Sequence, residues 1–416
     1  MKKVIGMLAL VALVGNIANA ELLKNFKYNG SIEGQGFVLN NALDFDTDAS
    51  DKFGEVNHRV MINAGFDLNE DVAATVSAVK CNRQMGDAPE KVNTLIDQFQ
   101  FEQAYLTLKG VIGLDHQIGR QYYGNDGDIV IYYGPANWYT RGMNAFAVAL
   151  DGWTSKWSKD KLGVTALASK QTEANGVINK DIDVYGVTAS YDYSEIVKPA
   201  AYYYEAKDYN TAAKVDDLQV IGVKVNGKYV GVEYGAEYAM NMGMDRNLTS
   251  TTNKDYKGSA MKFNAAYGYD FLGKWNFMGE YAMGTGDKNT ADSSDKSFQD
   301  INANYRPGLI LGGMGVTAIG GSSSLSNLTT WNVGANWTPE KLDKLNLCVK
   351  YYDFSYTEKV GTVDHAGTEA NLVATWTHSQ NVALKAGLAM FMPDELKIGG
   401  KDDSVKLASL YMNVKF

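Results

Sequence analysis

The arginines are the side chains of this sequence best suited to binding chemistry. There are only six of them, and they are Arg59, Arg83, Arg120, Arg141, Arg246 and Arg306. A guanidinium group forms two parallel hydrogen bonds with a carboxylate, so an arginine that faces a water-filled space can select carboxylate-bearing solutes. Arg59 falls on the polar face of an alternating segment, and Arg306 lies in the longest polar stretch. The alternative is that each arginine only pairs with a neighbouring acid.

Lysines and glutamates recur on the same polar faces. The lysines predicted to point inward are Lys109, Lys262, Lys350 and Lys385, and the glutamates are Glu102, Glu233, Glu237 and Glu280. Rings of charged side chains set the selectivity of pores. We therefore interpret these residues, with Arg59 and Arg306, as candidate pore-lining and solute-selecting groups. Because positive and negative side chains are both predicted to face the lumen, the pattern predicts an electric field across the pore. It does not predict which ion is preferred.

Catalytic spacing is absent from the sequence. Glu233 and Glu237 lie four residues apart, which is about 13 Å along a strand. The two carboxylates of a glycosidase lie closer, at about 5–9.5 Å. There is no nucleophile elbow and no His-Glu-x-x-His metal motif. The sequence therefore predicts no enzyme, cofactor or metal, and a barrel enzyme using rim residues such as His58 and His365 is the alternative. The formal net charge of −9 argues against a nucleic-acid partner.

The elements that carry these residues alternate with a period of two. Val60, Ile62, Ala64, Phe66 and Leu68 share one face of their segment, and polar residues dominate the other. Such alternation is typical of strands with one apolar and one polar face. A soluble secreted β protein would show the same alternation, but it would bury its apolar faces and extract without detergent.

The first twenty residues form a targeting signal rather than a structural element of the fold. Lys2 and Lys3 precede an apolar run, and Ala18-Asn19-Ala20 has the small-x-small form of a cleavage site. This pattern predicts a signal peptide at residues 1–20 and a single mature domain at 21–416. The alternative, a membrane-anchoring helix, needs a longer apolar run of about 20 residues.

The links between the alternating segments are short and long in turn. Bacterial outer-membrane barrels have short periplasmic turns and long extracellular loops, and only helices or closed barrels satisfy every backbone group in lipid. The sequence predicts an all-β transmembrane antiparallel barrel of about 18 strands, within a range of 16–20. The longest loop is expected at 286–325. Long polar links are also expected at 208–215 and 357–365, among others.

The last strand ends at Phe416, and Ala408, Leu410, Met412 and Val414 share its face. A final amphipathic strand ending in Phe resembles the signal that the barrel-assembly machinery reads. It predicts that machinery and outer-membrane lipid as partners.

An ordered set of short motifs resembles the alginate-export family of outer-membrane barrels. The motifs are Gln103-Ala104-Tyr105-Leu106-Thr107-Leu108, Ile118-Gly119-Arg120-Gln121, Gly127-Asp128, Trp138, Arg141, Asn144-Ala145, Gly284-Thr285-Gly286-Asp287, Phe298, Tyr305, Pro307, Gly312-Gly313, Gly367-Thr368-Glu369-Ala370-Asn371 and Phe391-Met392-Pro393. The resemblance implies an eighteen-stranded monomeric barrel whose charged pore passes an anionic polysaccharide. It also implies that Arg120 and Arg141 line the lumen, beside a loop that folds inward. The chain is shorter than expected for the exporter, has few arginines and lacks a His at 298–313.

Taken together, these patterns predict a porin in the outer membrane of a Gram-negative-type bacterium. We expect passive diffusion or export of hydrophilic, anionic solutes or oligosaccharides through a charged lumen. The alternative is a structural or adhesive surface barrel that acts through its extracellular loops.

Overall fold

The computed structural model describes residues 24–48, 52–82, 99–135, 148–173, 181–211, 214–246, 253–314 and 324–416. The predicted signal peptide at residues 1–20 lies outside these ranges.

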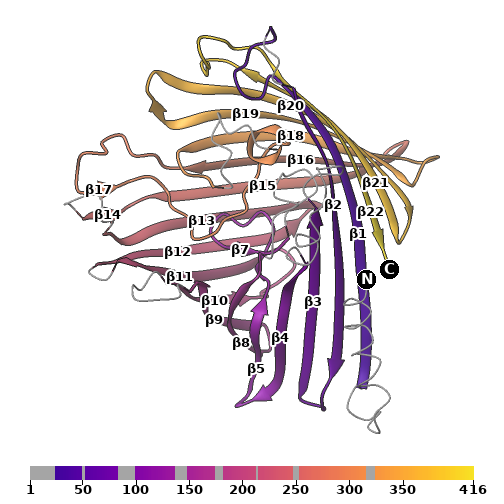
Figure 1. Ribbon diagram of the computed structural model, residues 1–416, viewed down its shortest axis with the longest axis vertical. Helices are drawn as coiled ribbons and strands as arrows, with labels where there is room; N and C mark the ends of the chain where they lie inside the picture. Colours follow the sequence, from indigo (N-terminus) through magenta and orange to yellow (C-terminus); the bar gives the residue numbers. More distant parts are fainter. Residues whose placement is uncertain are drawn as a thin grey trace.

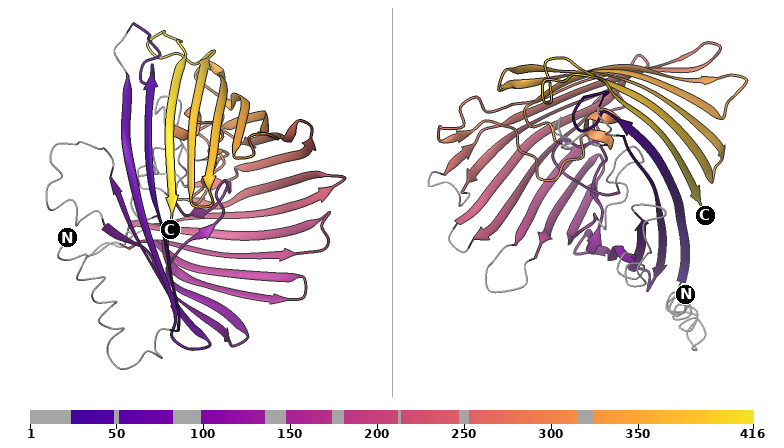
Figure 2. Two further views of the ribbon diagram at one scale, coloured as in Figure 1. Left: turned by 90° about the vertical axis from the view of Figure 1, so that its right-hand side faces the viewer. Right: turned by 45° about the horizontal axis from the view of Figure 1, so that its top comes forward.

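Within the described ranges, eighteen long antiparallel strands form one closed wall (Figure 1). They are β1 (Lys24–Asn40), β2 (Phe53–Asp67), β3 (Val72–Asn82), β4 (Phe99–Val111), β5 (Leu114–Gln121), β8 (Leu150–Lys159), β9 (Leu162–Thr172), β10 (Ile182–Tyr191), β11 (Lys198–Thr211), β12 (Lys214–Tyr229), β13 (Val232–Asp245), β15 (Ser259–Asp270), β16 (Gly273–Gly284), β18 (Leu328–Pro339), β19 (Leu345–Val360), β20 (Val363–Ser379), β21 (Val382–Pro393) and β22 (Val405–Lys415). β1 pairs with β2 and also with β22, from Ser31 opposite Lys415 to Asn40 opposite Lys406. Figure 2 shows the indigo N-terminal strands beside the yellow C-terminal strands, where the wall closes. The predicted barrel of about 18 strands is confirmed.

The other elements of the described residues are short. β6 (Tyr123–Gly124) and β7 (Tyr132–Tyr133) form a separate two-stranded sheet, and Figure 1 shows β7 inside the curve of the wall. β14 (Lys254–Tyr256) pairs in parallel with β17 (Ser294–Asp295), and η2 (Ile310–Met314) is a short coiled segment whose backbone is not helical at Leu311 and Gly312.

The alternation of side chains explains why these segments form a membrane barrel. Along β22, Leu407 and Tyr411 are buried, whereas Leu410 between them is 68% exposed. Leu388 and Val349 on nearby strands are 57% and 56% exposed. The apolar faces therefore lie outside, where lipid rather than water must cover them, and the soluble alternative fails.

Among the described residues, no helix is long and apolar enough to cross a membrane.

Two of the connections predicted to be long are short in the structure. β11 runs on to Thr211 and β12 begins at Lys214, and β19 ends at Val360 just before β20 begins at Val363. Since a transmembrane strand needs only about 9–11 residues, β12 and β19, with 16 residues each, continue as hairpins beyond the lipid. The loop predicted at 286–325 lies between β16 and β18, as expected.

Apolar side chains also pack inside the barrel, in two clusters. In the first, Phe45, Leu309 and Ile310 from loops pack with Phe354 and Phe391 of the wall. In the second, loop residues 129–131 pack against the wall strands, with Leu167 and Val184 among their neighbours. These contacts hold loop segments within the lumen, where they narrow it.

Candidate functional site

Two segments far apart in sequence fold into the lumen and meet there. The first is 122–135, between β5 and β8, and the second is 285–314, between β16 and β18. Ile131 and Asn302 form a parallel β-bridge, the Tyr132 amide donates to Asn302 O at 2.7 Å, and Asn302 Nδ2 donates to Tyr132 O at 2.6 Å. The lumen is therefore constricted by one joined structure rather than by two independent loops.

A tight turn shapes the first segment. Gly124 and Gly127 have φ of 80° and 85°, a conformation that glycine adopts without strain. The carboxylate of Asp128 accepts a hydrogen bond from the Asn125 amide at 2.9 Å, which closes the turn. The other oxygen of Asp128 is left to face the barrel wall.

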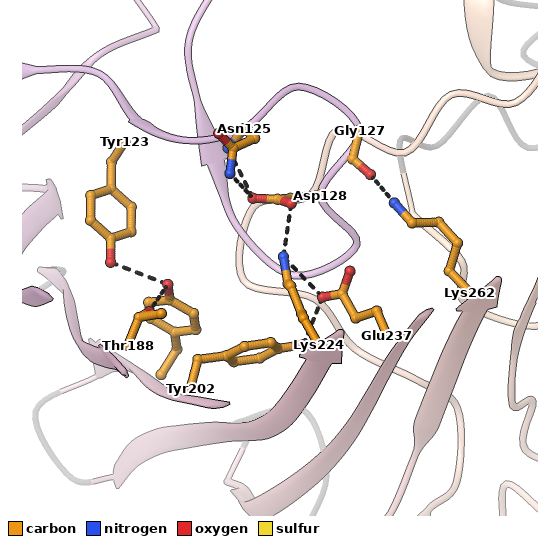
Figure 3. A network of polar contacts seen from close by, with 10 residues as sticks. Tyr123, Asn125, Gly127, Asp128, Thr188, Tyr202, Lys224, Glu237 and Lys262 are labelled. Carbon is orange, nitrogen blue, oxygen red and sulfur yellow. Dashed lines mark hydrogen bonds and ion pairs between the residues drawn. The ribbon is translucent and has the colours of Figure 1, made fainter. Parts of the chain in front are cut away.

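An ion-pair network joins that turn to the wall (Figure 3). Lys224 of β12 lies 2.8 Å from Asp128 and 3.2 Å from Glu237 of β13. Tyr202 of β11 donates to Glu237 at 2.8 Å. The Asp128 and Glu237 side chains are only 16% and 5% exposed. Removing one partner from such a buried network leaves uncompensated charge, so the network fixes the turn in place.

A lysine and a tyrosine connect the two segments to β15 and β16. Lys262 donates to Gly127 O at 2.7 Å, and its Nζ lies 5.8 Å from the centroid of the Tyr305 ring. Tyr305 donates to Glu280 at 2.9 Å. Burial raises the pKa of Tyr305, so its hydroxyl remains a donor to Glu280 at neutral pH.

A buried carboxylate anchors the second segment. Glu369 of β20 accepts hydrogen bonds from the amides of Leu309, Ile310 and Leu311, at 2.7, 3.1 and 2.9 Å. Glu369 is fully buried. The sequence motif that contains Glu369 was recognised, but its acid was not singled out, because its partners lie about sixty residues away in the chain.

The inserted segments and the wall enclose a polar cavity of about 570 Å³. Its charged lining residues are Asp126, Asp128, Lys262, Glu280, Arg306 and Lys350. A second cavity of about 780 Å³ extends toward the short turns and shares Asn264, Glu280, Asn332 and Lys350 with the first. The two polar cavities therefore adjoin along this part of the wall.

The inserted arginine is held by the second segment itself. Arg306 donates to Asn304 Oδ1 and to Gly312 O, both at 2.8 Å. Asn304 in turn donates to Asp126 of the first segment. Arg306 is therefore positioned at the cavity by the same contacts that join the two segments.

Most of the predicted site residues lie inside the barrel. These are Arg59, Arg306, Lys262, Lys350, Lys385, Glu102, Glu233, Glu237 and Glu280. Arg59 lies 2.5 Å from Glu33, and both side chains are buried, so this arginine pairs with a neighbouring acid. Lys109 is exposed beside the short turn after β4. The structure thus collects Lys262, Lys350, Arg306 and Glu280 at one cavity and leaves Arg59 and Lys109 away from it.

The prediction that Arg120 lines the lumen is wrong, because this side chain faces outward. It is paired with Asp151 on the outer face, with contacts of 2.5 and 3.1 Å. Its neighbour Gln121 is buried and bonded to Thr154 inside, so alternation directs Arg120 outward. Arg141 lies outside the described residues.

Comparisons with known proteins agree with this geometry. A model of the alginate export family matches residues 61–396, whereas no curated protein matches the chain. The structure of OccK11 (OpdR) of Pseudomonas aeruginosa is similar, with a TM-score of 0.61 and 10% identity over 95% of this chain and 97% of that one. OccAB4 of Acinetobacter baumannii gives 0.56 and 12%, over 95% and 98%.

A further similar structure is OccK2 (OpdF) of Pseudomonas aeruginosa, in complex with glucuronate. It gives a TM-score of 0.58 and 11% identity, over 95% of this chain and 97% of that one. At these identities the likeness shows a shared fold, and the family match covers most of the chain. The chain therefore belongs to the alginate export family, and it is an outer-membrane channel of the porin type rather than an enzyme.

Proposed function

We propose that this channel admits hydrophilic solutes that carry a carboxylate, with acidic sugars as the class that fits best. The observation that carries the proposal is the state of two lysines at the constriction. Lys262 and Lys350 line the cavity, and among the described residues neither forms an ion pair with a carboxylate. In contrast, Lys224 and Lys228 inside the same barrel are paired with glutamates.

The acids at the cavity are already engaged by other groups. Asp128 is paired with Lys224, Glu280 accepts from Tyr305, and Asp126 accepts from Asn304. A solute carboxylate would therefore meet ammonium groups with donors to offer, and Arg306 adds a guanidinium from the inserted segment. Rings of charge at the narrowest point, rather than the net charge of the chain, set selectivity.

The size of the cavity and the relatives support the same class of solute. A volume of about 570 Å³ lies in the range of small-molecule sites. OccK2 (OpdF), whose fold is shared, is in complex with glucuronate. A sugar acid combines hydroxyl groups with one carboxylate, which suits a polar cavity with a few cations.

Three further features of the mature protein belong to the proposal. Residues 1–20 would be removed as a signal peptide, and residues 21–416 would act as a monomeric barrel. The last strand would be read by the barrel-assembly machinery. Backbone hydrogen bonds between Phe416 and Gly30, at 2.9 and 3.0 Å, support a role for the C-terminus in closing the wall.

The test is single-channel recording of the refolded protein in a planar bilayer. We expect steady conductance, a reversal potential in a salt gradient that indicates anion preference, and block by glucuronate. The double change Lys262→Gln and Lys350→Gln should weaken the block about tenfold or more, because it removes two charged donors. Lys397→Gln is the matched control, since Lys397 lies in the loop after β21, paired with Asp402.

Block that is equal in the double variant and the wild type would contradict a role for these lysines. A folded, heat-modifiable barrel that never conducts would instead favour the structural or adhesive alternative. The polar cavities that remain beside segments 122–135 and 285–314 favour the channel, because they leave space in the lumen for a hydrophilic solute.

A further inference from the structure

A row of alternating charges crosses the outer face of six adjacent strands. Its members are Arg120, Asp151, Lys170, Asp183, Lys207 and Asp217, one from each of β5, β8, β9, β10, β11 and β12. Each is the direct cross-strand partner of the next. Cross-strand neighbours of opposite charge attract, and two of these pairs, Arg120–Asp151 and Lys170–Asp183, are in ion-pair contact. We call this set the charged row.

The burial of flanking residues shows that the charged row faces outward. Leu150 and Val184, which directly flank Asp151 and Asp183, are buried in the inner apolar cluster. Ser169, next to Lys170, is also buried. One step down the outer face, Trp153 and Tyr185 are 50% and 39% exposed. The row therefore lies on the surface that meets the membrane, immediately beyond a row that contains aromatic side chains.

The height of Lys170 places the middle of the row at the edge of the apolar belt. Lys170 is eight residues from Leu162, where β9 leaves its short turn, which is about 27 Å along the strand. With the usual strand tilt of about 35–45°, that is about 20 Å along the barrel axis. The apolar belt of such barrels is about 25 Å tall, and charge on the lipid face is tolerated only near its edges. Because the strands are tilted, direct cross-strand partners lie at different heights, and the row climbs from Arg120, six residues from Leu114, to Asp217, twelve residues from Tyr229. Lys170 and Lys207, which is nine residues from Lys198, therefore lie at the boundary on the long-loop side, which is the outer leaflet, and Arg120 lies below it.

The three cations of the row keep hydrogen-bonding capacity for a ligand. Arg120 uses two of its five N–H donors on Asp151, Lys170 uses two of three on Asp181 and Asp183, and Lys207 uses one on Glu205. Their side chains are 37%, 40% and 34% exposed. They stand on every second strand, about 10 Å apart.

We propose that the charged row binds the phosphorylated head groups of outer-leaflet glycolipid. The location decides the occupant, because whatever covers outward cations at the height of Lys170 and Lys207 is head group rather than acyl chain, and the long side chain of Arg120 reaches the same layer from below. Cation donors at this spacing suit phosphate oxygens, and the exposed acids between them suit hydroxyl groups or bridging divalent cations of the same layer. The proposal goes beyond solute selection, since none of these side chains faces the lumen cavity.

The test is native mass spectrometry of the detergent-solubilised barrel with lipid A that carries two phosphates. We expect the wild type to retain this lipid in preference to a dephosphorylated lipid A, and to release it as salt rises. The triple change Arg120→Gln, Lys170→Gln and Lys207→Gln should weaken retention by about fivefold for each cation removed. The matched control is Lys161→Gln, Lys198→Gln and Lys344→Gln, three exposed lysines at the short-turn end.

Conductance and heat-modifiability of the triple variant should equal those of the wild type, which shows that it folds. Those readouts also separate this proposal from the solute proposal, which would fail through conductance. Equal retention of both lipids, or equal retention by the triple variant, would overturn the inference. So would a barrel dimer that the triple variant abolishes, because the row would then be an interface between copies of this chain.

Discussion

Two lysines on neighbouring parts of the wall have the same local chemistry and opposite surroundings. Lys224, inside the barrel, lies between Asp128 and Glu237 at 2.8 and 3.2 Å. Lys170, on the outer face, lies between Asp181 and Asp183 at 2.7 and 3.1 Å. The acids of Lys224 include one that is 96 residues away, whereas those of Lys170 lie within 13 residues.

The difference lies in what each lysine holds. The Lys224 network ties an inserted segment to the wall in a place with little water, so its loss would leave buried carboxylates. The Lys170 pairs hold only adjacent strands together at an exposed surface, where water and salt can replace them. A lysine between two acids is therefore a structural anchor on one face and an available ligand on the other.

The largest effect that tests the inner anchors is expected at Glu369. Glu369→Ala would leave the amides of Leu309, Ile310 and Leu311 buried without an acceptor, at about 1–3 kcal/mol each. The segment should then leave the lumen, and single-channel conductance should rise about twofold or more as the constriction widens.

Glu395→Ala is the matched control for that change. Glu395 also accepts backbone amides, from Asp364 and His365 at 2.6 and 3.3 Å, but it lies at the exposed long-loop rim. The single-channel conductance of the Glu395→Ala variant should equal that of the wild type. An unchanged conductance in Glu369→Ala would show that the apolar cluster alone holds the segment.

The second test compares the two lysines directly. Lys224→Met should lower the free energy of unfolding by about 3 kcal/mol, because Asp128 and Glu237 lose their shared cation. Lys170→Met should leave it nearly unchanged. Urea-induced unfolding in lipid vesicles, followed by tryptophan fluorescence, would measure both. Equal losses in the two variants would remove the distinction between the inner and outer faces.

The strands were predictable because the signals that define them are local. Alternation along β2 and β22 needs no information from the rest of the chain, and the succession of short and long links gives the strand number. The connections after β11 and after β19 were predicted to be longer than they are, because polar residues beyond the lipid look alike in sequence whether they pair or not. Strand pairing above the membrane leaves no apolar face to recognise.

The site was less predictable because its contacts are distant in sequence. Asp128 meets Lys224, and Glu369 meets Leu309, through folding of inserted segments that no local pattern describes. Arg120 was misplaced for another reason. Its place in the lumen was what the family resemblance implied, and it was not tested against the alternation within β5. There the buried Gln121 faces inward, so its neighbour Arg120 faces outward.

The smallest expected effect concerns a third kind of site, the exposed contact between loops at the long-loop end. The Thr47 amide donates to Asp403 at 2.8 Å, and Lys401 lies 3.0 Å from Asp46. The hydrogen bond from Thr47 lowers the pKa of Asp403, and the one from Lys401 lowers the pKa of Asp46. A carboxyl whose folded pKa is lowered stabilises the contact above its unfolded pKa, about 3.9, and the stabilisation is lost as pH falls through the folded pKa.

Hydrogen exchange at the Thr47 amide should therefore be slow at neutral pH, after correction for the intrinsic rate, and lose protection below about pH 4. Asp403→Asn should remove that pH dependence, whereas Asp402→Asn, one residue away and paired with Lys397, should keep it. Conductance should not change in either variant, because these loops contribute no residue to the lumen cavity. Protection that persists at low pH would show that Asn41, which donates to Ser404 O at 2.9 Å, holds the two loops together without the carboxylates. The exposed loop contact would then resemble the inner anchors, where neutral hydrogen bonds and packing accompany the ion pairs.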